Sequence, residues 1–165
     1  MAVKSKAANL FNVHPGEGRI VAWLLLQYFL LGGAFNFVQT AAFPLFLVEF
    51  SAQTLPYVYI ANAVIVTLIT TLYLRLGRRL SFARLLSANL AFLFVLILLF
   101  RLGLNLPDAS WVIFALPILF QILVNLGNLA FWPLANRMFN VRQGKRLFGL
   151  VGSGQWLAIV LTGFL

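Results

Sequence analysis

Two rows of amide and hydroxyl side chains interrupt the apolar part of this sequence. The rows are Gln121, Asn125 and Asn128, and Asn36, Gln39 and Thr40. Their members recur at intervals of three and four residues, so each row lies on one face of a helix. Uncharged groups of this kind can line a path for a small polar solute, or can join helices by interhelical hydrogen bonds. Either role predicts that both rows face inward, because an amide that faces hydrocarbon is costly.

Other reactive residue types are scarce. The chain has no Cys, and its single His, His14, lies in a polar N-terminal segment. The three acidic residues, Glu17, Glu49 and Asp108, are far apart in the sequence. Such a set cannot supply a thiolate metal site, a thiol nucleophile or a paired acid and base within a membrane. We therefore predict no metal, no cofactor and no enzymatic activity.

Five apolar stretches must position the two rows. They cover residues 20–48, 56–76, 82–100, 111–138 and 147–165. About twenty apolar residues span a bilayer, where the backbone must be helical. Only 9% of the 165 residues are charged, against about 25% in an ordinary soluble domain. The sequence therefore excludes a soluble enzyme and predicts an all-α, polytopic transmembrane helix bundle over 19–165, with about five spans after an N-terminal segment of residues 1–18.

The basic residues alternate between the segments that flank these stretches. The N-terminal flank and the second and fourth connections hold three, four and four of them, whereas the first and third connections hold none and one. The positive-inside rule then places the N-terminus in the cytoplasm of a multi-pass protein of the plasma (inner) membrane. The net charge of +9 is thus explained by topology, so we predict the lipid bilayer as a partner and no nucleic acid.

The second connection resembles a loop of a known superfamily. It holds Arg75, Gly77, Arg78 and Arg79. This segment is similar to the D-R-x-G-R-R loop between helices two and three of the major facilitator superfamily, except that Leu74 stands in the Asp position. The resemblance implies a cytoplasmic gating role for these residues.

The fourth connection resembles the nucleotide-transporter (ATP/ADP carrier) family. The F-W-x-x-A-N and K-R-x-(x)-x-F-G passages of that family are matched here by Phe131, Trp132, Ala135, Asn136, Lys145, Arg146 and Gly149. Pro15, Gly16 and Glu17 are also similar to the start of that family. The resemblance covers nearly the whole chain and implies a facilitator fold of twelve helices, of which this chain holds about five.

That family uses a Lys in helix one and a Glu in helix four. The matching regions of this chain, around Thr40 and Gln121, are uncharged, which argues against nucleotide exchange. The resemblance and the amide rows together predict the N-terminal part of a facilitator-type permease, a secondary transporter that moves an unidentified small polar solute by alternating access. The alternative is a non-transporting membrane anchor or sensor domain for an attached soluble region.

The sequence ends within its fifth apolar stretch. Facilitator halves contain six helices, so we expect a fragment whose partners include missing C-terminal helices of the same fold. Gly149 and Ser153, near the start of that stretch, are small residues four positions apart. This spacing indicates either close approach of a neighbouring helix or a backbone anion site at a helix start, and we predict the packing role.

Overall fold

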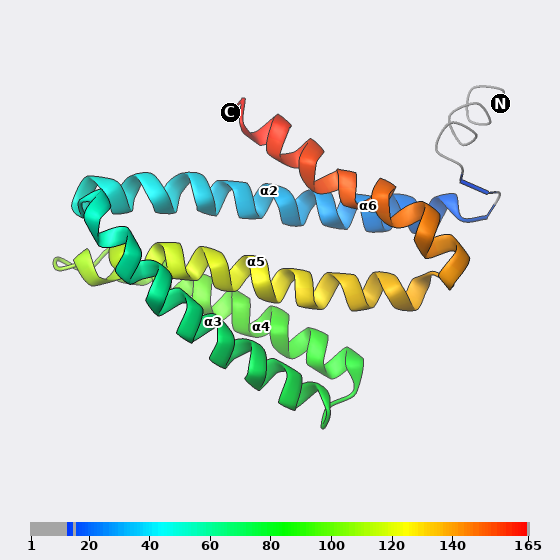
Figure 1. Ribbon diagram of the computed structural model, residues 1–165, viewed down its shortest axis with the longest axis horizontal. Helices are drawn as coiled ribbons and strands as arrows, with labels where there is room; N and C mark the ends of the chain where they lie inside the picture. Colours follow the sequence, from blue (N-terminus) through cyan, green and yellow to red (C-terminus); the bar gives the residue numbers. More distant parts are fainter. Residues whose placement is uncertain (1–12, 15, 165) are drawn as a thin grey trace. The chain divides into compact units, whose positions relative to one another are not determined.

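The computed structural model describes residues 13, 14 and 16–164, and within them every regular element is a helix (Figure 1). Predictions that concern Lys4, Lys6, Pro15 and Leu165 fall outside this set. The helices are α2 (Gly18–Glu49), a short 3-10 helix η1 (Ala52–Thr54), α3 (Leu55–Gly77), α4 (Phe82–Gly103), α5 (Ser110–Met138) and α6 (Val141–Thr162). The predicted all-α class is confirmed.

Most helices extend past the predicted apolar stretches at one end or both, because helical hydrogen bonding continues into residues outside the hydrocarbon. Helix α6 shows the largest difference at its start, which is Val141 and not 147. Asn140 and Gln143 form a reciprocal capping box there, in which each side chain satisfies a backbone N–H group of the other. A local capping motif therefore determines where α6 begins.

Four helical segments are long and apolar enough to cross a membrane: α2, η1 with α3, α4, and α5. Helix α6 is not among them within the described residues, since its first turns carry Arg142, Lys145 and Arg146. Many outward apolar side chains are exposed, such as Leu68 at 65% and Phe94 at 69%. Extensive apolar exposure of this kind is typical of lipid-facing helices. A fifth span stays a prediction.

The chain divides into two compact units, and α2 and α5 contribute to both. The first unit comprises residues 1–37 and 131–165, and the second unit comprises residues 38–130. In the first unit, the Tyr28 ring stacks on Phe131 with ring centroids 4.3 Å apart, and Trp132 meets both rings edge-on. Leu147 and Val151 of α6 are completely buried against this aromatic group.

Backbone contact between α2 and α6 also holds the first unit together. A Cβ atom on Gly154 would lie 2.7 Å from the Leu25 carbonyl oxygen, and one on Gly32 would lie 2.8 Å from the Gln155 Cα. These glycines are required because any side chain would collide with the opposite backbone.

The predicted packing role of Gly149 is wrong, although close approach on α6 does occur. A Cβ atom on Gly149 would meet nothing within 4 Å. The Ser153 hydroxyl donates to the Leu150 carbonyl of its own helix at 2.7 Å. The contact is made by Gly154 on a different face of α6, because the rotation of the helix about its axis decides which small residue meets α2.

The second unit has its own core, formed by Phe46, Val58, Ile118, Ile122 and Leu126. Asn89 of α4 is buried, with 5% exposure, and its Nδ2 donates to the Leu126 carbonyl of α5 at 3.2 Å. The Tyr73 hydroxyl of α3 donates to the Leu129 carbonyl of α5 at 3.4 Å. Polar side chains of α3 and α4 are thus tied to the backbone of α5.

Within each unit, the structure pairs helix ends that the alternation of basic residues places on one side of the membrane. In the second unit, the Ser110 hydroxyl at the start of α5 donates to the Glu49 carboxylate at the end of α2, at 2.6 Å. In the first unit, Gln143 near the start of α6 donates to the Glu17 carboxylate before α2, at 2.9 Å. These pairs agree with antiparallel succession of the helices.

Candidate functional site

The amide row of α5 lies around the middle of this 29-residue helix. Gln121, Asn125 and Asn128 are all half-buried. The Thr70 hydroxyl of α3 donates to Asn125 Oδ1 at 3.4 Å, and Asn128 Nδ2 donates to the Val124 carbonyl of its own helix at 2.8 Å. The row therefore includes both an interhelical hydrogen bond and a bond within α5.

Part of the hydrogen-bonding capacity of this row is unused. Among the described residues, the Gln121 amide and the Asn125 Nδ2 group form no hydrogen bond with the protein. Both side chains are only half-buried, so they can reach a partner that is not protein. An uncharged solute with hydroxyl or amide groups has the complementary chemistry.

The row predicted on α2 is divided between the two units. Asn36 belongs to the first unit, where its Nδ2 donates to the Thr162 hydroxyl of α6 at 2.8 Å. Gln39 and Thr40 belong to the second unit and are exposed. Asn36 thus serves the helix-joining role that was the alternative for this row, and a path-lining role for Gln39 and Thr40 stays a prediction. Which side chains of α2 contact α6 depends on how α2 is rotated about its axis. The spacing of residues in the sequence does not show this rotation.

The facilitator-like loop at the end of α3 is basic and exposed. Arg75, Arg78 and Arg79 line a surface hollow together with Leu72 and Leu76. In the described part of the chain, these three guanidinium groups have no hydrogen bond or ion pair. A Cβ atom on Gly77 would lie 3.3 Å from Leu85 Cδ2, so this glycine marks a close approach of α3 and α4.

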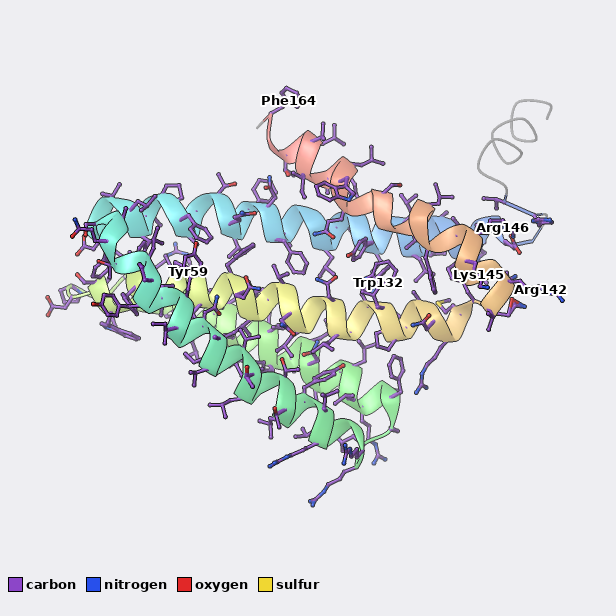
Figure 2. The ribbon with its side chains drawn as sticks, in the orientation of Figure 1. Tyr59, Trp132, Arg142, Lys145, Arg146 and Phe164 are labelled. Carbon is purple, nitrogen blue, oxygen red and sulfur yellow. The ribbon has the colours of Figure 1, made fainter. Side chains whose placement is uncertain are left out.

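The motif that resembles the nucleotide-transporter family contains both core residues and surface residues. Phe131 and Ala135 are buried in the first unit, with 2% and 0% exposure, and are packing residues. Asn136 and Lys145 line a hollow at the turn between α5 and α6. Figure 2 shows Arg142, Lys145 and Arg146 gathered on the first turns of α6, whereas Trp132 lies on α5.

A polar cluster around Glu17 was missed by the sequence analysis. The Glu17 carboxylate accepts hydrogen bonds from the His14 backbone N–H at 3.0 Å and from Gln143 Nε2 at 2.9 Å, and it forms an ion pair with Arg146. The hydrogen bond from His14 contributes most to holding the pKa of Glu17 below its usual value of 4.5, followed by that from Gln143. The Glu17 side chain is only 14% exposed.

The geometry of the turn before α2 places this carboxylate. The Glu17 N–H donates to the His14 carbonyl at 3.1 Å, and Gly16 between them has a φ of 95°. Glycine adopts this left-handed conformation without the steric penalty of a side chain. The spacing of Gly16 and Glu17 indicates a turn, but the partners on α6 are more than 120 positions away, so only the fold reveals them.

Comparisons with known protein families, curated proteins and solved structures find no match. The resemblance to the facilitator superfamily and to the nucleotide carriers therefore rests on the quoted motifs and stays a prediction. Among the described residues, no group of three or more His, Asp or Glu side chains is placed to hold a metal ion. The chemistry available to the described part of the chain is hydrogen bonding along α5 and attraction of anions at its basic helix ends.

Proposed function

We propose that this chain is the N-terminal part of a facilitator-type secondary transporter, in the plasma (inner) membrane with its N-terminus in the cytoplasm. Its cargo is a small, uncharged polar solute. The observation that carries the proposal is the half-buried row on α5, where Gln121 and Asn125 retain unused amide groups in the middle of an apolar helix. Polar groups at that depth are costly unless they serve a solute path or a helix contact.

The distribution of charge favours an uncharged solute over a nucleotide. In α2, α3, α4 and α5, all charged side chains lie in the first or last turn. A phosphate-bearing solute would pass the middle of these helices, where no basic side chain can balance its negative charge. An unbalanced charge is unfavourable in a medium of low dielectric. The amide side chains can donate and accept neutral hydrogen bonds with hydroxyl and amide groups of a solute.

Solute uptake by a complete transporter that contains this chain as its N-terminal part, reconstituted in liposomes, tests the proposal. The panel consists of a radiolabelled sugar, a polyol, a nucleoside and ATP, and we expect uptake of an uncharged member and none of ATP. Gln121→Leu and Asn125→Leu should each reduce this uptake about 10-fold or more, because each removes a hydrogen bond to the solute worth about 1–3 kcal/mol. Uptake of ATP, or uptake unchanged in both variants, would contradict the proposal.

Thr71→Val is the matched control for these substitutions. The Thr71 side chain is exposed, and its hydroxyl donates only to the Thr67 carbonyl of its own helix, at 2.8 Å. The variant removes a polar group from a membrane helix without touching the α5 row. We expect uptake to match that of the unmodified protein.

The second candidate function is a membrane anchor or sensor domain. It is favoured by polar contacts that join helices, among them those from Asn36 to Thr162, from Thr70 to Asn125 and from Asn89 to Leu126. A static bundle needs contacts of this kind and no solute path. Absence of flux for the whole panel, combined with a lower unfolding temperature of Asn125→Leu, would favour this function over transport.

A further inference from the structure

An apolar groove follows the contact between α3 and α4, which lie side by side in Figure 1. Its walls come from Ile69, Leu72, Tyr73 and Leu76 of α3 and from Leu85, Ala88, Asn89 and Phe92 of α4, and its floor is Leu126 of α5. The groove has a volume of about 170 Å³. An apolar cavity of about 150 Å³ admits a benzene-sized molecule, so this groove can take part of a hydrocarbon chain.

The polar side chains of the groove are already engaged. The Tyr73 hydroxyl donates to the Leu129 carbonyl at 3.4 Å, and Asn89 Nδ2 donates to the Leu126 carbonyl at 3.2 Å. Both bonds are made to the backbone of α5, behind the groove. The groove therefore offers its occupant apolar contact, and a polar molecule would lose hydrogen bonds with water on entry.

The groove continues into the basic hollow at the end of α3. Leu72 and Leu76 line both, and Arg75, Arg78 and Arg79 complete the hollow. The acidic residues of the second unit are Glu49 and Asp108, which flank the starts of α3 and α5. The hollow lies at the opposite end of α3, roughly 30 Å away at 1.5 Å per residue. Within this unit, the three guanidinium groups thus have no acidic side chain to neutralise them.

We propose that the groove and the hollow together bind one anionic phospholipid. Its acyl chain lies in the groove between α3 and α4, and its phosphate group lies among Arg75, Arg78 and Arg79. Guanidinium groups match phosphate oxygens in charge and geometry, and apolar walls suit the chain. A soluble anion would use only the hollow, and a zwitterionic lipid lacks the net charge that the hollow attracts. The proposal does not depend on transport.

Lipid binding to the 165-residue chain, measured by native mass spectrometry from a neutral detergent, tests the headgroup site. The probes are phosphatidylglycerol and phosphatidylcholine with identical acyl chains. We expect phosphatidylglycerol to bind about 10-fold tighter or more, because each basic residue near the headgroup adds to the attraction. The triple variant Arg75→Gln, Arg78→Gln, Arg79→Gln should lose this preference.

The control triple variant carries Arg137→Gln, Arg142→Gln and Lys145→Gln, which removes the same charge from the other basic connection. It should keep the preference for phosphatidylglycerol. Equal binding of the two lipids, or loss of the preference in both triple variants, would overturn the proposal, because the hollow at α3 would then have no special role.

A second pair of variants tests the groove without altering any charge. Ala88→Phe fills the groove, whereas Ala91→Phe adds the same ring to an exposed position of α4 outside the groove lining. We expect Ala88→Phe to weaken binding of both lipids about 10-fold, and Ala91→Phe to leave it unchanged. Unaltered lipid binding by Ala88→Phe would overturn the proposal. So would a lipid-free dimer that Ala88→Phe disrupts, since the groove would then belong to a second copy of the chain.

Discussion

The Glu17 carboxylate links two segments that are far apart in the sequence. It accepts hydrogen bonds from the His14 backbone and from Gln143, and it pairs with Arg146. These contacts favour the ionised form, which is why the pKa of Glu17 lies below 4.5. A carboxyl group with a lowered pKa stabilises the fold above its unfolded pKa, and this stabilisation is lost as the pH falls through the folded pKa.

We predict that acid weakens the first unit through Glu17. The unfolding temperature in detergent should fall as the pH drops from about 4.5 through the lowered pKa of this group. Glu17→Gln should lower the unfolding temperature at pH 7 and show a smaller acid dependence. Asp108→Asn removes an exposed carboxylate that has no hydrogen bond or ion pair among the described residues, and it should behave as the unmodified chain does. Identical pH profiles for Glu17→Gln and the unmodified chain would contradict the assigned role.

At the scale of elements, the crossing of α2 and α6 depends on glycine. Gly154 faces the backbone of Leu25 and Phe29, whereas Gly149 has open space on its own side of α6. Helix α6 thus contains one glycine that has no room for a side chain, Gly154, and one that has room, Gly149. Sequence spacing alone identified the wrong one, since small residues recur along the whole start of α6.

We predict that Gly154→Ala lowers the free energy of unfolding by about 1–3 kcal/mol, the usual cost of an overpacked contact. Gly149→Ala should leave stability unchanged or raise it by up to about 1 kcal/mol, because alanine favours the helix. Denaturant unfolding in mixed micelles, followed by circular dichroism, measures both. Equal stability of the two variants would show that α2 and α6 do not touch at Gly154.

For the molecule as a whole, the proposed membrane topology rests on the alternation of basic residues. Gln53 in η1 and Ser81 before α4 are both exposed, and they lie in connections that hold no and four basic residues, respectively. We predict that a membrane-impermeant maleimide labels Gln53→Cys in intact cells, and labels Ser81→Cys only after permeabilisation. The chain has no native Cys to interfere. The reverse pattern of labelling would invert the proposed orientation.

Several features of the fold were predictable from the sequence because they depend on local properties. The long helices of the described residues follow from the length of the apolar stretches and from the need of the backbone to satisfy its hydrogen bonds. The sides proposed for the connections follow from the placement of basic residues. Neither inference requires knowledge of which residues meet in space.

Hydropathy and the placement of charges are enough to specify a helical membrane chain with a nearly charge-free interior. Tertiary structure alone decided that Asn36 joins α6, that Gln121 keeps an unused amide, and that Glu17 pairs with Arg146. The physical reason is that hydropathy and helix formation act over a few neighbouring residues, whereas these contacts depend on how each helix is rotated and where it crosses its neighbour.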